Sequence, residues 1–436
     1  MTTHPRPPAA PVTLALVGAG LRGLTYARHA HATGAGRITA LAEPDPVRAA
    51  AAAAEFGVPP ERVHPHWRAL AAAGRQADAA IIATQDRMHA DPAVALAATG
   101  HHLLVEKPMA AEEREAERIA EAAERHDVLL AVCHVLRYTP YTRTLKALLD
   151  EGRIGRLVGA EHLEPVGWWH FAHSFVRGNW RRSDTSGPLL LTKACHDLDW
   201  LVHLFGRTPR TVMSYGSRTH FRPEGAPPGA TARCGDCPVE PDCPYSAPRL
   251  YLGCLGDPHR EFWPLSAVTA EPTRAGVEEA LRTGPYGRCV YACDNDAADH
   301  QVVAMEFADG ATATFTVSAF TPMSERRTRL FGTHGHIEGD GAALRITDFR
   351  TGREERVEPA AGAPGGGHGG GDLALTEAFL AAVASGDGDL LLSGPRTSLA
   401  THRLVWAAER ARALGAPVDV RPAGPDARAD GRGSIG

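Results

Sequence analysis

The fold is decided by VTLALVGAGLRG, residues 12–23, where an apolar run passes directly into a glycine-rich turn. Gly18, Gly20 and Gly23 have the G-x-G-x-x-G spacing, after a segment typical of a strand and before one of helical period. In this setting the first glycine allows a tight turn, the second lets the backbone approach a pyrophosphate, and the third permits close helix packing. The stretch predicts a dinucleotide-binding turn, and a similar turn without a ligand is the alternative.

A carboxylate suited to NAD follows at the expected distance. Glu43 closes the next apolar run, RITALAE, about twenty residues after the last of these glycines. A carboxylate there can accept hydrogen bonds from the two ribose hydroxyls of NAD, and it repels the extra phosphate of NADP. We therefore predict NAD as the cofactor, bound also by Leu21 and Arg22 at the start of the helix. Arg22 and Arg48 keep NADP as the alternative, since an arginine can rotate toward a phosphate.

Beyond this turn, short apolar runs alternate with alanine-rich stretches of helical period as far as about residue 138. This alternation is typical of a doubly wound parallel sheet. Period-two runs such as HQVVAMEF and ATATFTVSAF follow, and they predict an open, mostly antiparallel sheet. The predicted organisation, α/β plus α+β, is a Rossmann domain over 1–138, a sheet domain over 139–420 with a Cys-rich insertion at about 220–265, a flexible loop over 362–371 and a disordered tail over 421–436.

Composition excludes several classes of protein. The chain has 436 residues, and 44% of them are hydrophobic, which suffices for more than one core. Acidic residues outnumber basic ones, 51 to 46, so neither nucleic acid nor an anionic membrane is an expected partner. The first residues lack an apolar signal core, and no apolar run is long enough to span a membrane. We expect a cytoplasmic protein whose eight cysteines are reduced thiols or metal ligands.

Charged and polar residues end the fourth and fifth predicted strands of the parallel sheet, in ATQDRMH and VEKP. Ligands of open α/β sheets bind outside the carboxyl ends of the strands. Thr84, His89, Glu106 and Lys107 are therefore predicted to border the nicotinamide end of the cofactor. The alternative is that Glu106 and Lys107 only begin the next helix, with Pro108 in its first turn.

Three motifs taken together resemble one family: GAGLRG, EKP about ninety residues later, and the histidine of CHDLDWLVHLFG. Their order and spacing are similar to those of the glucose-fructose oxidoreductase, inositol dehydrogenase and rhizopine catabolism protein family, Gfo/Idh/MocA. The resemblance spans most of the chain and implies a Rossmann domain followed by a sheet domain with the substrate pocket and oligomer contacts. It implies cofactor roles for the three glycines and Glu43, a substrate contact for Lys107 and a catalytic role for His196. It also implies a homo-oligomer, either a dimer or a tetramer.

The chemistry of these two side chains agrees with the implied roles. Removing hydride from a carbinol carbon also requires removing the hydroxyl proton, and an imidazole such as His196 is a suitable base. An ammonium group such as that of Lys107 can donate a hydrogen bond to the oxygen on which charge develops. The alternative for His196 is a packed histidine on a buried helix.

The sequence departs from the family four residues before this histidine. An aspartate usually stands there, but this chain has Thr192, followed by Lys193. Lys193 and His196 fall on one face of the predicted helix, so we expect Lys193 to replace the carboxylate in the pocket as a third catalytic residue. Asp197 or Asp199 is then expected to orient the His196 ring. The departure suggests a branch with another substrate or another overall reaction.

Further substrate contacts are predicted from two segments. CHVLRYTP follows the last strand of the parallel sheet, and WWHFAHSFVRGNWR combines aromatic rings with polar groups that suit the faces and hydroxyls of a sugar. The alternatives are structural roles at the domain junction and in a core or oligomer strand. The predicted contacts are Arg137, Tyr138, Trp169, His170, Asn179 and Trp180, together with Asp197.

We therefore predict an NAD-dependent oxidoreductase that transfers hydride from a hydroxyl-bearing carbon of a sugar, cyclitol or glycoside. One alternative is redox-neutral glycoside cleavage, in which oxidation is followed by elimination and the hydride returns. The altered surroundings of His196 leave this reaction open. Another alternative is a non-catalytic protein that senses a sugar or NAD. Lys107 and His196 together argue against it, because a sensor needs neither an acid nor a base.

Cysteines cluster in RCGDCPVEPDCPY, a segment too rich in proline, glycine and polar residues to build a core of its own. Cys234, Cys237 and Cys243 bring three thiols into one loop, with a spacing typical of a structural zinc site that needs a fourth ligand. Cys289 and Cys293, in YGRCVYACDN, are the predicted donors of the fourth thiolate. The alternatives are unligated thiols, a disulfide or an iron-sulfur cluster.

Overall fold

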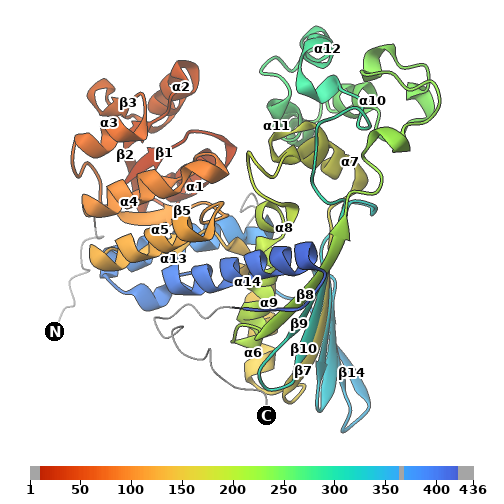
Figure 1. Cartoon of the computed structure of the whole chain (residues 1–436). Helices are drawn as coiled ribbons and strands as arrows, with labels where there is room; N and C mark the ends of the chain where they lie inside the picture. The colour runs from red at the N-terminus through yellow and green to blue at the C-terminus, as the bar shows by residue number, and fades with distance from the viewer. Residues whose placement is uncertain (1–9, 363–367, 421–436) are drawn as a thin grey trace, which may run out of the picture.

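The computed structural model describes residues 10–362 and 368–420, and in these ranges it contains two sheets that lie side by side (Figure 1). The first sheet has six parallel strands in the order β3-β2-β1-β4-β5-β6, which confirms the predicted Rossmann arrangement. Its strands are β1 (Val12–Val17), β2 (Gly36–Ala42), β3 (Val63–His64), β4 (Ala79–Ile82), β5 (His102–Val105) and β6 (Leu130–Val132). Its helices are α1 (Leu21–Ala32), α2 (Pro46–Phe56), α3 (Trp67–Ala72), α4 (Ala90–Ala98) and α5 (Glu113–Arg125).

The Rossmann strands form because both faces of the sheet are covered. All residues of β4 are buried, as expected for a parallel strand between two helical layers. In α5, by contrast, Ala116, Ile119 and Ala123 face the sheet while the glutamates and arginines between them face solvent. The same helical period is visible in the sequence, and it determines which face of α5 packs against the sheet.

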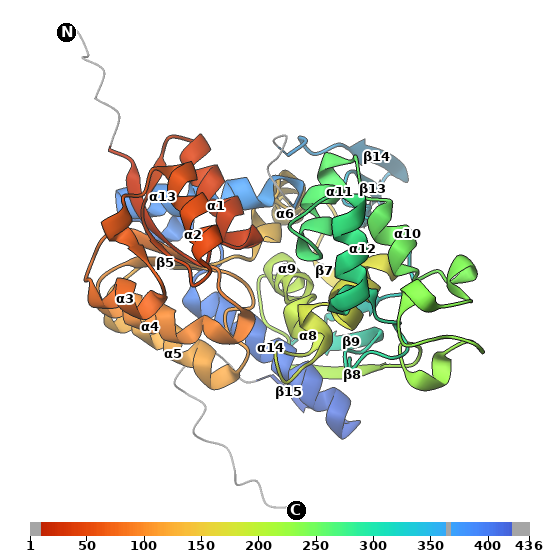
Figure 2. The same ribbon diagram turned by 90° about the horizontal axis from the view of Figure 1, so that it is seen from above.

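Two helices from the end of the chain return to this domain. Leu375, Phe379 and Leu380 of α13 (Gly371–Ser385) join the core on one side of the parallel sheet. Leu399 of α14 (Pro395–Leu414) joins the core on the other side. Figure 2 shows α14 passing from α5 beneath β8 and β15, and it contacts both halves of the molecule. The two halves are therefore tied together by buried helices as well as by a linker.

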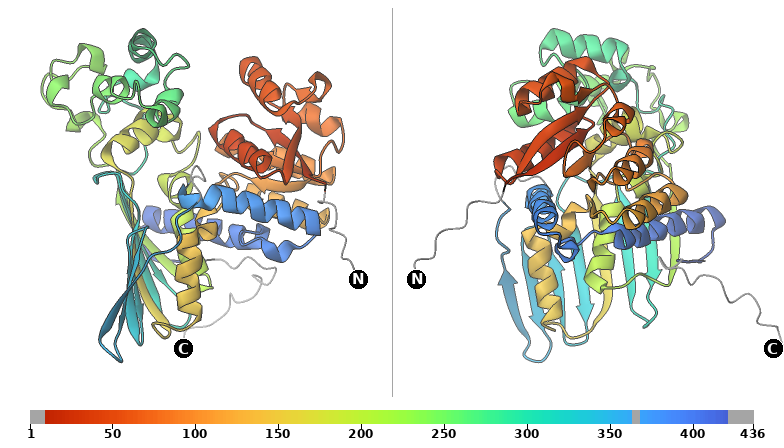
Figure 3. Two further views of the ribbon diagram at one scale, coloured as in Figure 1. Left: turned by 180° about the vertical axis from the view of Figure 1, so that it is seen from behind. Right: turned by 90° about the vertical axis from the view of Figure 1, so that its left-hand side faces the viewer.

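The second sheet has nine strands in the order β14-β13-β12-β11-β7-β10-β9-β8-β15, and only β7 and β10 pair in parallel. Alternate residues of β9 and β10 are buried, which confirms the period-two prediction. Its helical cover includes α9 (Cys195–Phe205), which contacts β7 and β10, and α14 (Figure 3). The strands are β7 (Leu157–Pro165), β8 (Thr211–Ser217), β9 (His300–Glu306), β10 (Thr312–Ser318), β11 (Arg327–Gly332), β12 (Gly335–Gly339), β13 (Leu344–Asp348), β14 (Arg353–Val357) and β15 (Val418–Asp419).

The Cys-rich insertion is larger and better packed than predicted. It fills the whole connection between β8 and β9 and contains α10 (Ala247–Leu252), α11 (Pro258–Phe262) and α12 (Arg274–Thr283). Tyr251, Leu265 and Val277 are fully buried in a small separate cluster. The segment RCGDCPVEPDCPY builds no core of its own, as predicted, and apart from Cys234 the residues of the buried cluster come from downstream of it.

The glycine-rich loop also differs from the prediction. Residues 363–367 and the predicted tail, 421–436, lie outside the described residues. His368 begins a short helical turn, and α13 starts at Gly371, where the prediction had a flexible loop. A Cβ on Gly371 would lie 2.4 Å from the carbonyl oxygen of Val135, so the missing side chain allows this close packing. Close backbone contact therefore orders the end of the loop.

Candidate functional site

The turn between β1 and α1 has the three features that a dinucleotide needs. Gly18 has φ 92°, and a Cβ there would lie 2.6 Å from the carbonyl oxygen of Ala83. A Cβ on Gly23 would lie 2.1 Å from the carbonyl oxygen of Gly18, so the helix packs directly on the turn. A Cβ on Gly20, however, would meet no atom within 4 Å. The turn is therefore tight on its protein side and open at the position where a pyrophosphate approaches.

Glu43 lies at the end of β2, beside this turn, and its side chain is buried. Its Oε2 accepts a hydrogen bond from the backbone N–H of Ala19 at 2.7 Å, and its Oε1 accepts from Asp45 and Arg48. A carboxylate oxygen can accept two hydrogen bonds, so Oε2 retains capacity for a ribose hydroxyl. The residues around the turn fit NAD, and Leu21, which is 40% exposed, stands at the start of α1 next to the open side.

Arg22 is not free to turn toward a ligand phosphate. Its Nε donates to Oε1 of Glu106 at 2.6 Å, and its Nη2 pairs with Oδ1 of Asp372 at 2.7 Å. Burial alone would raise the pKa of Glu106, but Arg22 and then Lys107 outweigh burial and hold this pKa below its usual range. These pairs give no support to the prediction that Arg22 turns toward the extra phosphate of NADP, and the choice between NAD and NADP stays a prediction. Glu106 accepts hydrogen bonds from Arg22 and Tyr26 and so anchors the first helix.

His89 lies between the loops that follow β4 and β5. It is buried, and its ring nitrogens lie 2.8 Å from the carbonyl oxygen of Pro108 and 3.2 Å from that of Thr84. Both nitrogens are thus used to join the loops that follow β4 and β5. The predicted direct contact between His89 and the cofactor is not favoured by this geometry, whereas Thr84 remains partly exposed at the carboxyl end of β4.

Lys107 reaches from the Rossmann half to the sheet domain. Its Nζ donates to the carbonyl oxygen of Thr192 at 2.6 Å, where α8 (Leu189–Thr192) ends. The helix is interrupted at this point, since α9 begins only at Cys195, so the single helix face predicted for Lys193 and His196 is broken. The interruption leaves a backbone carbonyl for Lys107 to bind.

His196 stands on the first turn of α9, and 5% of it is exposed. Its Nδ1 is buried without a hydrogen-bond partner among the described residues. Burial, followed by the charge of Lys107, lowers the pKa of His196 well below its usual value. The ring is therefore neutral at neutral pH and has a lone pair with which to accept a proton.

The aspartates predicted to orient His196 have other partners. Asp197 pairs with Arg326 and lies 3.1 Å from Nε2 of His162. Burial would raise the pKa of Asp197, but Arg326 and His162 hold this pKa well below its usual range. Asp199 receives two hydrogen bonds from Arg137, at 2.6 and 2.7 Å. The prediction that either aspartate orients His196 was wrong, because each carboxylate is fully buried in an ion pair.

Lys193 is placed at the site by a carboxylate that sequence analysis missed. Its Nζ lies 2.8 Å from Oε1 of Glu164, at the end of β7, and Arg326 lies 2.9 Å from Oε2 of the same group. Glu164 had a sequence signal, since it ends an apolar strand with a charge, as Glu106 does. Arg326 had none, because it follows a loop more than a hundred residues away. The site thus contains a lysine, a glutamate and an arginine in contact.

Arg137 and Tyr138 lie at the junction between the two halves. Besides its pair with Asp199, Arg137 donates to the carbonyl oxygen of Leu392 at 2.7 Å. The hydroxyl of Tyr138 accepts from the backbone of Leu392 at 2.8 Å and bonds Ser393. Both side chains are buried, so the structural alternative explains them better than the predicted substrate contact.

The aromatic segment divides into two parts. Trp169 and His170, on α7 (Trp168–Phe171), pack against Trp263 of the insertion, with ring centroids 5.3 and 4.8 Å apart. Burial, and then Lys193, lowers the pKa of His170 well below its usual value. These rings therefore lie beside the charged groups of the site.

Trp180 and Asn179 are exposed. The indole N–H of Trp180 donates to Oδ2 of Asp86 at 2.9 Å, in the loop that follows β4. This hydrogen bond connects the two halves across the candidate crevice. No contact of Asn179 identifies a role for it.

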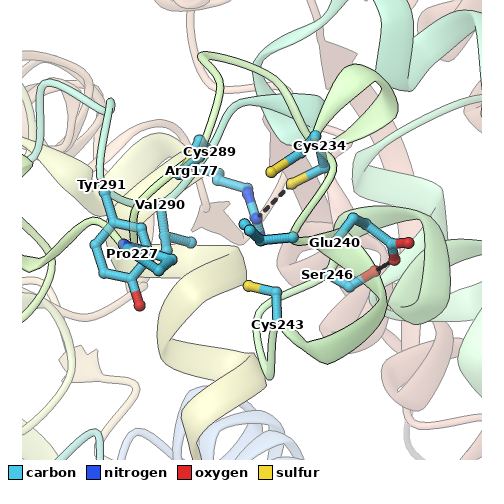
Figure 4. A pocket seen from close by; sticks show the side chains of 12 residues that line it. Arg177, Pro227, Cys234, Glu240, Cys243, Ser246, Cys289, Val290 and Tyr291 are labelled. Carbon is cyan, nitrogen blue, oxygen red and sulfur yellow. Dashed lines mark hydrogen bonds between the residues drawn. The ribbon is translucent and has the colours of Figure 1, made fainter.

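Four cysteines line one small cavity of the insertion (Figure 4). They are Cys234, Cys237, Cys243 and Cys289. Arg177 enters the cavity, and its Nη2 lies 3.5 Å from the sulfur of Cys234. Within residues 10–362 and 368–420, no group of three or more His, Cys, Asp or Glu side chains is arranged so that it could hold a metal ion, so the structure does not show the predicted zinc site.

The remaining candidate ligand is elsewhere. Cys293 does not line the cavity, and its thiol donates to the carbonyl oxygen of Cys289. Burial raises the pKa values of Cys243 and Cys289 above the usual thiol value. These two side chains are therefore neutral thiols in the absence of a metal.

Comparison with known proteins agrees with this assembly. Residues 12–134 match the model described as "Oxidoreductase family, NAD-binding Rossmann fold", and residues 146–420 match "Oxidoreductase family, C-terminal alpha/beta domain". The protein is therefore an NAD-binding oxidoreductase by class. It belongs to the Gfo/Idh/MocA family, which confirms the resemblance seen in the sequence.

Two curated relatives show how far the likeness extends. The chain is 27% identical to "Putative oxidoreductase YteT" of Bacillus subtilis (strain 168) over 316 residues, which is 70% of each protein. It is 33% identical to "Inositol 2-dehydrogenase 2" of Saccharopolyspora erythraea over 210 residues, 48% of this chain and 58% of the relative.

Solved structures show the same fold over nearly the whole chain. A levoglucosan dehydrogenase in complex with NADH and levoglucosan gives a TM-score of 0.68 at 19% identity, covering 94% of this chain and 99% of that one. An Agrobacterium radiobacter oxidoreductase in complex with NAD+, L-tartaric acid and magnesium gives 0.68 at 20% identity, covering 94% and 98%. In the part of this chain that the structure describes, no helix is long and apolar enough to cross a membrane.

Proposed function

We propose that the protein is an NAD-dependent dehydrogenase that oxidises a hydroxyl-bearing carbon of a sugar, cyclitol or glycoside. One observation supports this proposal most directly. Lys107 donates a hydrogen bond to the carbonyl oxygen of Thr192, at the break between α8 and α9, and the neutral ring of His196 begins α9 just after this break. The names of relatives, a levoglucosan dehydrogenase and an inositol 2-dehydrogenase among them, support a carbohydrate-like substrate. Glu43 supports NAD over NADP, since its buried carboxylate would lie against the extra phosphate.

The residues of the chain divide the chemistry between them. The glycine turn and Glu43 would hold NAD, which would supply the hydride acceptor. His196 takes the hydroxyl proton, and Lys107 stabilises the negative charge that develops on the same oxygen. Lys193, held by Glu164, lies where a second substrate hydroxyl can accept a hydrogen bond from it. Trp169 and His170 provide partly buried aromatic faces for the ring of the substrate.

An assay with a panel of sugars, cyclitols and glycosides tests the proposal. We expect net formation of NADH in proportion to oxidised product, and a higher kcat/KM with NAD than with NADP. Product without net NADH would replace this function by redox-neutral glycoside cleavage, for which the missing aspartate partner of His196 is the supporting observation. Binding without conversion would indicate a sensor. The cytoplasmic location and the homo-oligomeric state stay predictions.

We also propose a structural zinc in the insertion, which the four cysteines that line its cavity would bind once their side chains move closer together than in this structure. Zinc with four thiolates carries a net charge of minus two, and the guanidinium of Arg177 would compensate part of it. The cavity favours Cys289 over Cys293 as the fourth ligand. A closed set of four thiolates leaves no position for water or substrate, so the metal would act on stability alone.

Elemental analysis of protein purified without chelator is expected to find about one zinc per chain. The Cys234→Ser, Cys237→Ser double variant should lose this metal and unfold at a lower temperature, since the two remaining cavity thiols cannot close a four-ligand zinc site. Cys293→Ser is the matched control and should keep both metal and stability. Metal-free wild-type protein of full stability, or iron in place of zinc, would contradict the proposal.

A further inference from the structure

His368 is a second histidine at the candidate site, and the roles given above do not use it. It comes immediately before α13, and its ring centroid lies 6.0 Å from that of His196. The two rings belong to segments far apart in the sequence. Unlike His196, His368 reaches solvent, since 42% of its side chain is exposed. His368 therefore lies between the buried ring of His196 and solvent.

A carboxylate fixes the orientation of this ring. Nδ1 of His368 lies 3.2 and 3.0 Å from the two oxygens of Asp372, one turn along α13. Asp372 is in turn held by Arg22, next to the dinucleotide turn. Because Nδ1 is engaged with a carboxylate, Nε2 is the nitrogen left to exchange a proton. The same pairing with a carboxylate is what His196 lacks.

The backbone at His368 is strained. Its φ is +38°, and Asp127 is the other non-glycine residue with positive φ in the described ranges. Glycine would adopt this conformation at lower cost, and the next three residues are glycines. A side chain kept in such a conformation is held there by its surroundings, which indicates a use for the imidazole.

The buried base needs a neighbour of this kind. Each oxidation leaves one proton on His196, and the ring has no hydrogen-bond partner at Nδ1 through which to release it. His134 also lies with its ring centroid 6.0 Å away, but it is fully buried, and burial lowers its pKa to about 3. His134 therefore cannot carry the proton outward at neutral pH, whereas His368 borders solvent.

We propose that His368 is the proton relay of the site, passing the proton of each turnover from His196 to solvent while Asp372 orients its ring. This inference rests on the proposed function, because that reaction releases the proton. The substrate hydroxyl gives its proton to His196. A water molecule or a second substrate hydroxyl between the rings then accepts that proton and donates one to Nε2 of His368. His368 loses its proton to buffer, and both histidines return to their neutral forms.

The test is a His368→Gln variant assayed at low and high concentrations of imidazole buffer. We expect kcat to fall by about tenfold or more in dilute buffer and to recover as imidazole replaces the missing relay. NAD affinity and the rate of the first hydride transfer should stay near wild type, because these steps do not need the proton to leave. A merely structural loss would not be restored by buffer.

His300→Gln is the matched control. His300 is 43% exposed and pairs with Asp299 at 2.9 Å, so it has the same exposure and a similar carboxylate partner, but it lies on β9. It should keep wild-type kcat in every buffer. Unchanged turnover in His368→Gln, or a folded variant whose loss imidazole does not restore, overturns the relay. NADH formation by the wild type decides the proposed function separately, and its absence overturns both.

Discussion

Replacing His196 or Lys107 with alanine is expected to lower kcat by roughly a hundredfold or more, the usual worth of a positioned acid or base. His196 is neutral because burial and Lys107 lower its pKa, and Lys107 is held at the same place by the carbonyl oxygen of Thr192. Neither side chain contacts the glycine turn, so the dissociation constant of NAD should stay within about twofold of wild type. Steady-state kinetics and NAD titration measure the two quantities.

His203→Ala is the control for the histidine. It lies on the same helix, two turns further on, and is half-buried away from the α8–α9 break. Its kcat should match wild type if the effect of His196→Ala comes from chemistry and not from the helix. Full activity in both His196→Ala and Lys107→Ala would exclude these residues from the reaction and with them the proposed mechanism.

Local geometry explains which parts of the site the sequence could predict. The glycine turn depends on residues at most five positions apart, and Gly18 and Gly23 take the conformations and contacts that their spacing implied. Glu43 follows the next strand, so its place beside the turn is fixed by the βαβ unit. Strand order and helix faces follow from periodicity in the same way.

Long-range pairs could not be predicted. Arg22 and Asp372 are 350 residues apart in the chain, and nothing in the neighbourhood of either indicates the other. His368 lies near His196 because α13 begins at Gly371, whose missing side chain lets the helix pack against the backbone of Val135. Such contacts depend on how two completed domains pack, which no local pattern contains.

The sequence also does not determine the partner of a polar side chain at a strand end. Lys107 and His89 both follow strands of the parallel sheet at its carboxyl edge. The first reaches across to the other domain, and the second turns inward to two backbone carbonyls. Arg137 likewise pairs with Asp199 and not with a ligand. Burial decides among these outcomes, and burial is a property of the assembled fold.

We expect the protein to lose stability as the pH is lowered, already at pH values where the carboxylates are still ionised. His134, His173 and His402 are buried, and burial is the main cause that lowers their pKa values to about 3, 3 and 4. In the unfolded chain a histidine has a pKa of about 6.5. As pH falls below that value, each of these three histidines binds a proton in the unfolded chain that it does not bind in the folded protein, and the partly buried His170 and the buried His196 add to the effect. The free energy of unfolding therefore decreases from about pH 6.5 down to about pH 4.

The size of this effect makes it measurable. Each such histidine removes up to about 1.4 kcal/mol per pH unit, so three remove roughly 4 kcal/mol per unit, against a total of about 5–15 kcal/mol for a typical domain. Urea unfolding at pH 7 and pH 5 should show it. His134→Met should reduce the slope by up to about 1.4 kcal/mol per pH unit, the share of one histidine, and this ring has no hydrogen bond to lose among the described residues. His259→Met, at an exposed position, should not change the slope. Equal stability at the two pH values would contradict this prediction. It would mean that these histidines are protonated in the folded protein, and that water reaches the surroundings of His134 and His196.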